Sequence, residues 1–322
     1  PDSLTINSSN DGIEYDLIPH ESPITSNITF EANMVSRFKP TLTGNSTMTV
    51  EDGVRIDMYN SEIIIEPGST LTLGNNVTIK GKRGVNRITI RGNVQFGINV
   101  SFIAEEGAHL FVDFENEWLS TTINSGFFQR TNVDVSCHSL QLVNSTMLND
   151  NETRITVNRG SSFIIDNSLL SNFGNTLWRG IEVWGNTDVA QKPFTNQGIV
   201  QVVNGSIIEN AECGIRTWKP ASLPDGTIGD KPDKDYFGGV VWANEASFIN
   251  NKTAVEFLPY EYHNYSYFEN CTFKTDAALL NGLLPDYFVK LNGVSGIKIT
   301  GSDFINSYTG YTNINQRGGG IY

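Results

Sequence analysis

The sequence predicts an all-β solenoid in which short strands wind into stacked coils. Three observations predict it: a five-residue phrase that recurs along the chain, a second repeat centred on glycine, and a composition typical of a chain that turns often. The chain has 322 residues, of which 30 are glycine. Asn, Ser and Thr are also abundant, and these are residues that turns use.

The recurrent phrase consists of a small hydroxyl or acidic residue, two mostly apolar residues, a variable residue and an Asn-like residue. Its copies begin at Thr146, Ser168, Ser206, Ser247, Thr272 and Asp303. Their first residues lie 22 to 41 positions apart, and the longer steps read as the shortest step plus an insertion. A fixed period with length variation in loops is the pattern of a solenoid.

A glycine lies between paired apolar residues in four other segments. Apolar residues stand five and three positions before the glycine and three and five positions after it, at Gly53, Gly68, Gly107 and Gly160. Apolar residues two apart predict strands with one buried face. The glycine suits a corner that requires a positive φ. Two strands about such a corner, followed by a strand that carries the recurrent phrase, make one coil of a parallel β-helix.

The repeats extend over residues 45–322, whereas residues 1–44 lack the glycine-centred pattern. We therefore expect an N-terminal cap or a linker from a preceding domain over 1–44, and a parallel β-helix over 45–322 that continues beyond this sequence. A β-helix needs a covered first coil, because an open edge invites strand addition. Residues 115–135 are expected to be a loop-rich excursion, and 185–197 and 219–237 to be surface insertions.

The composition limits the classes of partner that we expect this protein to bind. The net charge is −13 at pH 7, which disfavours nucleic acid and anionic membrane surfaces. No stretch approaches the roughly 20 apolar residues of a membrane span. The three cysteines, Cys137, Cys213 and Cys271, have no paired spacing. They are expected to be small buried core residues rather than members of a disulfide framework or a zinc site.

Aromatic residues near the two insertions form the candidate ligand site. Strand alternation points Trp184 and Trp218 outward at equivalent positions of neighbouring coils. Flat indoles on an exposed sheet can stack against sugar rings. Each indole also precedes an insertion that can fold back over it as a satellite core, and this alternative stays open. The predicted glycan-binding residues are Trp184, Trp218, Trp242, Tyr236 and Tyr260.

Charged residues predict two further features, a row of charges across neighbouring coils and a candidate metal site. Glu182, Arg216 and Glu256 are expected to point outward on three consecutive coils, as a stabilising ladder without a catalytic role. Carboxylates in the second insertion could bind Ca²⁺ through oxygen ligands, although interleaved lysines favour a solvated acidic loop. The candidate metal ligands are Asp225, Asp230, Asp233 and Asp235, and Ca²⁺ is the single cofactor considered.

Segments 63–79, 178–185, 198–218 and 239–257 resemble right-handed parallel β-helix proteins of the pectate-lyase-like superfold. More narrowly, they resemble the surface and secreted β-helix proteins that Bacteroidota export through the type IX secretion system. The resemblance implies a single-stranded right-handed parallel β-helix with surface loop insertions, located outside the cell or on its surface. The Asp-Asp pair, the Gly-His-Gly and the Arg-Ile-Lys of polygalacturonase-like members do not occur in this sequence.

Three functions remain open. The favoured one is a non-catalytic extracellular or cell-surface β-helix protein, an adhesin, stalk or glycan-binding module within a larger exported polypeptide. Its partner would be a polysaccharide, a cell-surface glycan, or a surface protein of a host or neighbouring cell. The second is a polysaccharide lyase or glycoside hydrolase that acts on an acidic polysaccharide. The third is a phage-type fibre protein.

Overall fold

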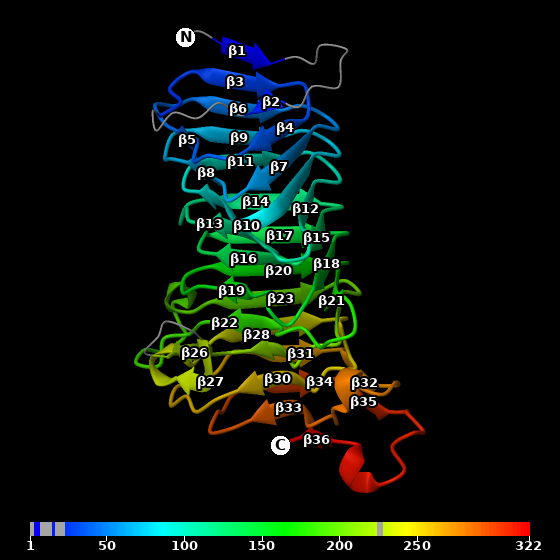
Figure 1. The fold of residues 1–322 in the computed structure, drawn as a ribbon. Helices are drawn as coiled ribbons and strands as arrows, with labels where there is room; N and C mark the ends of the chain where they lie inside the picture. Colours follow the sequence, from blue (N-terminus) through cyan, green and yellow to red (C-terminus); the bar gives the residue numbers. More distant parts are fainter. Residues whose placement is uncertain (1–2, 7–14, 17–22, 224–227) are drawn as a thin grey trace. The chain divides into compact units, whose positions relative to one another are not determined.

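The computed structural model describes residues 3–6, 15–16, 23–223 and 228–322, and β-strand is nearly the only regular secondary structure among them (Figure 1). The chain divides into two compact units, unit 1 over Pro1–Met147 and unit 2 over Leu148–Tyr322. Apart from one antiparallel hairpin in unit 2, strands that are consecutive along the chain belong to different sheets, and neighbouring strands within a sheet run parallel. Each unit is therefore a parallel β-helix, and the predicted fold class is confirmed.

Unit 1 has three main sheets, 1A, 1B and 1C. The strands of sheet 1A are β1 (Ser3–Ile6), β3 (Asn27–Phe30), β6 (Thr47–Val50), β9 (Thr70–Leu73) and β11 (Asn93–Phe96). Those of sheet 1B are β2 (Tyr15–Asp16), β4 (Met34–Ser36), β7 (Arg55–Tyr59), β10 (Thr78–Ile90), β12 (Ser101–Ala104) and β15 (Phe127–Gln129). Sheet 1C contains β5 (Thr41–Leu42), β8 (Glu62–Ile65), the second half of β10, β13 (Ala108–Phe114) and β16 (Thr131–Val135). β14 (Ser120–Asn124) pairs with β17 (Ser139–Val143), and the chain leaves the unit within β18 (Thr146–Asn149).

Unit 2 repeats this arrangement with sheets 2A, 2B and 2C. The strands of sheet 2A are β20 (Ser162–Asp166), β23 (Ile199–Val203), β28 (Val240–Asn244), β31 (Tyr267–Glu269) and β34 (Lys298–Thr300). Those of sheet 2B are β21 (Leu169–Asn172), β24 (Ile207–Glu209), β29 (Ser247–Ile249), β32 (Thr272–Thr275) and β35 (Asp303–Asn306). Sheet 2C contains β19 (Ile155–Val157), β22 (Ile181–Val183), β25 (Cys213–Arg216), β30 (Thr253–Phe257), β33 (Tyr287–Leu291) and β36 (Gly319–Ile321).

The remaining elements of unit 2 lie between coils. β26 (Lys219–Ser222) and β27 (Ile228–Asp233) form an antiparallel hairpin within the predicted insertion 219–237. The short 3₁₀-helices are η1 (Phe194–Asn196), η2 (Lys234–Tyr236), η3 (Leu280–Gly282) and η4 (Ile314–Gln316). None of the helices in the described part of the chain is long and apolar enough to cross a membrane.

Glycine forms the corners that the second repeat predicts. Gly53, Gly68, Gly107 and Gly160 have φ values of 73°, 88°, 74° and 77°, a region that L-residues with a Cβ rarely adopt. Each lies between two strands that belong to different sheets of its unit. The predicted corners are confirmed, because the glycine lets the chain turn between two faces of the coil.

Aromatic residues stack through the core of unit 2. In-register parallel strands lie about 4.8 Å apart, so equivalent inward side chains of successive coils contact each other. The ring centroids of Phe248 and Phe273 are 4.9 Å apart with planes at 7°. Those of Phe273 and Phe304 are 4.9 Å apart with planes at 4°. The stack joins three coils along sheet 2B.

The recurrent phrase marks the strands of sheet 2B. The predicted alignment is wrong by one residue for two copies, those that begin at Ser168 and Ser206. Ile207 pairs with Ser247, so Ser206 lies one position before the place that Ser247 occupies. Ser206 is buried, whereas Ser247 is half-buried on the outward face. Because successive side chains of a strand point to opposite faces, the small residue in these two phrases belongs to the core.

Strands also occur where the sequence pattern is weak. Residues 115–135, expected to be loop-rich, contain β14, β15 and β16, and that expectation is wrong. Hydroxyl and amide residues fill the outward positions there, while Ile123 and Phe128 remain buried. Within residues 1–44, β3 pairs in parallel with β6 of the following coil.

The three cysteines are buried and unpaired with one another, as expected of small core residues. Burial raises the pKa of the Cys137 and Cys213 thiols to about 12. A thiol with such a pKa is protonated at neutral pH and unreactive, because the thiolate is the nucleophile.

Candidate functional site

A depression of about 370 Å³ opens on the outward face of sheet 2A in unit 2. Its lining includes His263, Tyr265, Tyr267, Glu269 and Lys298. These side chains come from β31, from β34 and from the segment that precedes β31. The depression therefore combines ring faces with groups of both charges.

The centre of this site is a row of outward side chains at one strand position. The register of β28, β31 and β34 aligns Trp242 with Tyr267 and Tyr267 with Lys298. The two rings have centroids 6.4 Å apart and planes at 17°. Tyr267 is 36% exposed. In-register parallel pairing thus places two stacked aromatic rings, followed by an ammonium group, next to solvent.

The first insertion, 185–197, supplies a wall for the aromatic row. Phe194 of η1 meets the ring of Trp242 edge-on, with centroids 5.1 Å apart and planes at 88°. The Lys192 Nζ lies 4.0 Å from the centroid of the Tyr265 ring. The backbone N–H of Tyr265 donates to Oε1 of the buried Gln191 at 2.6 Å. The insertion is therefore fixed against the coil beside the depression.

A glycine admits the imidazole at the edge of the depression. Gly296 has a φ of 95°, and a Cβ built there would lie 2.6 Å from Cε1 of His263. Any larger residue would displace the ring, which lies 4.5 Å from the Tyr265 ring centroid to centroid. His263 also forms a parallel bridge with Ser295. The imidazole position thus depends on the absence of a side chain at Gly296.

The predicted aromatic residues lie in separate places rather than on one surface. Trp242 belongs to the row beside the depression. Trp184 packs edge-on against Tyr236, with centroids 5.6 Å apart. The Lys219 Nζ lies 4.7 Å from the Trp184 ring and 4.4 Å from the Tyr236 ring. The chain's own cation therefore occupies ring faces that a sugar would need.

Two other predicted residues are buried. The indole N–H of Trp218 donates to Oε2 of Glu256 at 2.9 Å. The Tyr260 hydroxyl donates to the carbonyl oxygen of Val189 in the first insertion at 2.6 Å. Burial raises the pKa of Tyr260 to about 12. At Tyr260 the first insertion lies against an aromatic residue, whereas Trp218 contacts residues of β25 and β30.

The predicted charge row is in register but not exposed. Glu182 pairs with Arg216, and Arg216 pairs with Glu256, on adjacent strands. Glu182 is 1% exposed and Arg216 is 8% exposed, so the expectation that both face solvent is wrong. Arg154 binds Glu182 at 2.6 Å, and the ring of Trp218 lies against Arg216. Neighbouring side chains that the pattern could not place cover the row.

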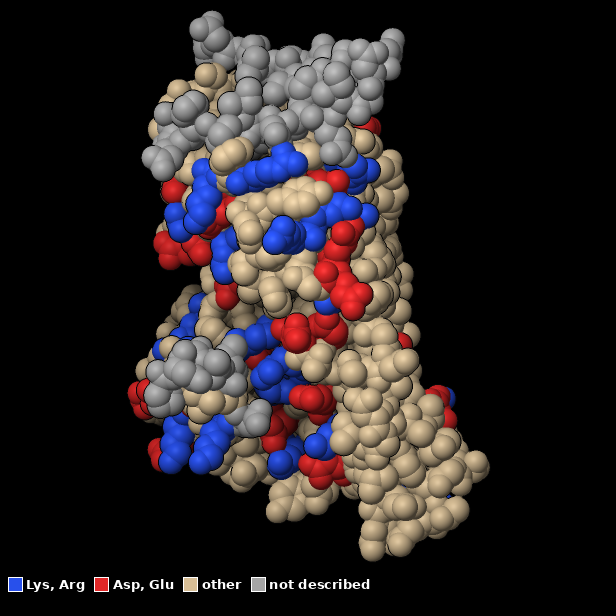
Figure 2. Space-filling view, in the orientation of Figure 1, with Lys and Arg blue, Asp and Glu red and all other residues tan. Residues whose placement is uncertain are grey.

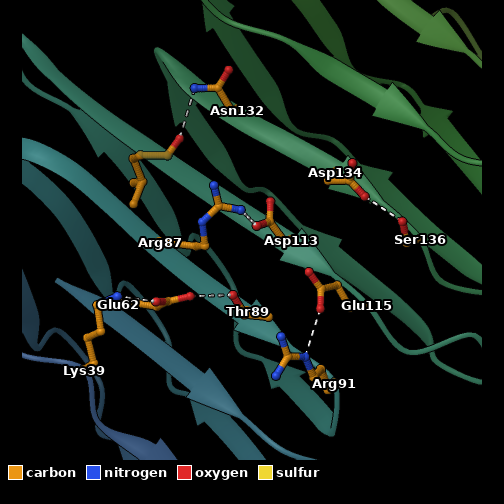
Figure 3. Close-up of polar contacts among 11 residues, drawn as sticks. Lys39, Glu62, Arg87, Thr89, Arg91, Asp113, Glu115, Asn132, Asp134 and Ser136 are labelled. Carbon is orange, nitrogen blue, oxygen red and sulfur yellow. Dashed lines mark hydrogen bonds and ion pairs between the residues drawn. The ribbon is translucent and has the colours of Figure 1, made fainter. Parts of the chain in front are cut away.

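Unit 1 carries a comparable network on sheet 1C. Figure 3 shows Arg87 reaching Asp113 and Arg91 reaching Glu115 on the next strand. Burial raises the pKa of the Asp113 carboxyl to about 6, against the lowering effect of Arg87. Figure 2 shows acidic and basic side chains side by side over the face that carries this sheet. Opposite charges thus attract across coils in the pairs Arg87–Asp113 and Arg91–Glu115.

The predicted metal ligands are only partly described. Asp225 lies outside the described residues, and so does the side chain of Asp230. Oδ1 of Asp233 accepts a hydrogen bond from the backbone N–H of Asp235 at 3.2 Å and caps η2. Among the residues that the structure describes, no three His, Cys, Asp or Glu side chains gather to hold a metal ion.

Sequence reasoning missed most of the depression. Tyr265 and Tyr267 alternate with the buried Ser266 and Phe268, a strand signal that could have placed both tyrosines outward. Tyr267 lies beside Trp242 because of the register between β28 and β31. A long connection joins these two strands, and a single sequence does not specify the register across it. A comparison of the chain with models of protein families, with curated proteins and with solved structures finds no match.

Proposed function

We propose that the protein is a non-catalytic extracellular or cell-surface β-helix that binds a glycan in the depression on sheet 2A. One observation carries the proposal: Trp242 and Tyr267 lie in one stacked row that Lys298 continues, and the depression opens beside them. A glycan is a chain of flat-faced rings, and the C–H face of a pyranose packs well against an aromatic ring.

The charges near this row favour an acidic sugar. Lys298 lines the depression, Lys192 lies against its Tyr265 wall, and Glu269 is the carboxylate of the lining. Two ammonium groups against one carboxylate attract a uronate or a sulfate ester locally, although the chain as a whole is acidic. At low salt this attraction is stronger, because exposed charges are screened by added ions.

The scaffold suits binding by a fixed surface. Tyr267 and Lys298 belong to paired parallel strands, and Trp242 donates its indole N–H to the carbonyl oxygen of Tyr265 at 3.2 Å. A site on strands loses little conformational entropy when the ligand binds. We therefore assign the row a role in holding a glycan, as an adhesin or glycan-binding module does.

The resemblance of segments such as 178–185 and 239–257 to exported β-helix proteins supports a proposal about the export route. On that ground we propose a protein of Bacteroidota that passes through the type IX secretion system and acts within a larger exported polypeptide. Detection of the protein on the surface of such a cell, and its loss from the surface in a secretion mutant, tests this part independently of ligand binding.

The binding proposal is tested with a panel of pectin, alginate, sulfated algal polysaccharides and host glycans. Retention of the chain on each polymer and release of reducing-end or unsaturated products are both recorded, with and without Ca²⁺. The expected result is retention without product, lost in Tyr267→Ala. Phe173→Ala is the matched control, because Phe173 is 37% exposed and follows sheet 2B instead.

The same assay decides between the alternatives. Product release would replace the proposal with a lyase or hydrolase, since His263 and Glu269 line the depression as proton-transfer groups. Equal retention of Tyr267→Ala and wild type would show that the depression is not the binding site. A stable trimer without retention would favour the fibre alternative.

A further inference from the structure

Unit 1 contains a depression of its own, about 670 Å³ in volume, that no part of the proposed function uses. Its lining comes from turns of successive coils, where the strands of sheet 1C end. The residues that matter for its chemistry are Arg91, Asn93, Glu115, Asn116, Glu117 and Trp118. Figure 3 shows Arg91 and Glu115 joined across two neighbouring coils at this place.

Trp118 is the most exposed large apolar side chain among the described residues, at 84%. Its backbone is nevertheless fixed. The N–H of Trp118 donates to Oδ1 of Asn116 at 3.1 Å, and the Nδ2 of Asn116 donates to the carbonyl oxygen of Gly92 on the preceding coil at 2.7 Å. The next residue, Leu119, is buried. A rigid turn therefore presents an uncovered indole to solvent, which is typical of a recognition site rather than of packing.

Polar groups surround this indole in a fixed arrangement. Arg91 donates through Nε to Glu115 and through Nη1 to Glu66, both at 2.9 Å. These hydrogen bonds, chiefly the one to Glu115, raise the pKa of the guanidinium further. Carboxylate, amide and guanidinium groups beside one ring face are the partners that sugar hydroxyls use, since each hydroxyl both donates and accepts.

The balance of charge differs from that of the depression in unit 2. Here Glu115 and Glu117 stand against Arg91, and Arg91 already neutralises part of Glu66 behind it. In unit 2, Lys298 and Lys192 stand against Glu269. A carboxylate or sulfate on a sugar is therefore repelled in unit 1 and attracted in unit 2.

We propose that the Trp118 depression is a second carbohydrate site that takes a neutral or amino-bearing pyranose and excludes acidic sugars. This inference rests on the proposed function in one respect only, namely that the ligand is a carbohydrate. Unit 1 holds one kind of glycan on Trp118, and unit 2 holds another on Tyr267. The protein thereby links two chemically different polysaccharides.

The test titrates the full chain with chitotetraose and cellotetraose as neutral probes, chitosan tetraose as the cationic probe, and tetragalacturonate as the acidic probe. Calorimetry is run on wild type, Trp118→Ala and Tyr267→Ala. The expected result is at least about a tenfold loss of affinity for a neutral probe in Trp118→Ala, with tetragalacturonate binding unchanged. Tyr267→Ala is expected to show the opposite pattern.

A second variant isolates the charge. Glu117 lines the depression, whereas the partners of Arg91 are Glu115 and Glu66, so Glu117→Gln tests the local field without removing a partner of Arg91. It is expected to weaken chitosan tetraose severalfold at low salt and to leave chitotetraose unchanged. Equal affinity of both variants and wild type for every neutral and cationic probe overturns the inference.

Failure of the inference and failure of the proposed function give different results. No binding of any neutral or cationic probe, or binding that Trp118→Ala does not affect, refutes the second site while leaving the unit 2 site intact. Loss of tetragalacturonate binding in Trp118→Ala would also contradict the inference. Unchanged tetragalacturonate binding in Tyr267→Ala refutes the proposed function alone. Circular dichroism of Trp118→Ala is expected to match wild type, because the indole is almost fully exposed.

Discussion

Trp242 and Tyr267 occupy the same position on adjacent parallel strands, and their rings lie 6.4 Å apart with planes at 17°. This pairing is the reason that we propose the glycan site on this sheet. Parallel strands in register align equivalent side chains at one strand spacing, so two aromatic residues at one position lie ring against ring. Neither ring is sandwiched between cations, whereas Tyr236 lies between Arg159 and Lys219.

The first prediction concerns the aromatic core of sheet 2B. Phe273 stacks on Phe248 and on Phe304, and its side chain is fully buried. Phe273→Ala is expected to lower the free energy of unfolding by about 3–5 kcal/mol, through lost burial and an internal cavity. Urea unfolding followed by circular dichroism measures the loss. Phe273→Leu, which keeps most of the volume, is expected to cost about 1.5 kcal/mol or less, and equal losses would contradict the account.

The second prediction separates backbone strain from steric overlap at two glycines. Gly107 has a φ of 74° and open space at the position of a Cβ, whereas a Cβ on Gly180 would lie 1.6 Å from the carbonyl oxygen of Cys213. Gly107→Ala is expected to cost about 1–2 kcal/mol from the left-handed backbone alone. Gly180→Ala should cost a further ~1–3 kcal/mol from overpacking.

Thermal unfolding of both variants tests this difference. Gly107→Asn serves as the control, because Asn adopts positive φ more readily than Ala. The account requires Gly107→Asn to be more stable than Gly107→Ala. A Gly180→Ala variant as stable as Gly107→Ala would show that the approach to Cys213 imposes no constraint.

The third prediction is a pH dependence with an unusual sign. Burial raises the pKa of Asp113 to about 6 in the folded protein, the nearby Asp134 adds to the rise, and Arg87 opposes it. Because this folded value lies above the unfolded one, the folded state holds the proton more tightly. The stabilising contribution of Asp113 therefore grows as the pH falls through 6 toward the unfolded value near 4.

Asp113→Asn isolates that contribution. Other carboxyls, such as Glu105 beside Lys82, have a lowered pKa, so their contribution to the stability of the fold is lost as the pH falls. Only the difference between variant and wild type is therefore informative. As the pH falls from about 7 to about 4.5, the free energy of unfolding of wild type minus that of Asp113→Asn is expected to rise by about 2 kcal/mol. A difference that is constant over this range, or that changes in favour of the variant, contradicts a raised pKa.

The fourth prediction concerns the thiols. Cys137, Cys213 and Cys271 are buried, and burial raises the pKa of all three. A colorimetric disulfide reagent is therefore expected to label none of them in the native protein and all three after denaturation. Rapid labelling of one thiol under native conditions would show that its coil opens or that the thiol is exposed.

The sequence predicts the coils well because their determinants are local. Gly107 and Gly160 turn at positive φ as the apolar spacing around them requires. The six phrases mark strands because alternation depends on neighbours two residues apart. The one-residue error at Ser206 arose because a hydroxyl residue fits both the outward face and a crowded inward corner.

The candidate site was harder to predict because it depends on contacts that are distant in sequence. Nothing near Trp218 indicates that Glu256 accepts its indole N–H, and nothing near Tyr260 indicates that Val189 covers it. The contact with Val189 results from the path of the first insertion, and the contact with Glu256 is made to strand β30. Trp118 is hard to predict for a related reason: the weak pattern of its segment indicates a loop, whereas β14 begins two residues later and the Trp118 N–H is bound by Asn116.

The fifth prediction tests the central claim most directly. The acidic polysaccharide that the full chain retains most strongly is cut to oligosaccharides, and their affinity is measured by calorimetry for wild type, Tyr267→Ala, Tyr267→Phe and Phe173→Ala. The account predicts at least about a tenfold loss for Tyr267→Ala, with affinity kept in the other two variants and no product formed. Equal affinity for Tyr267→Ala and wild type would contradict it.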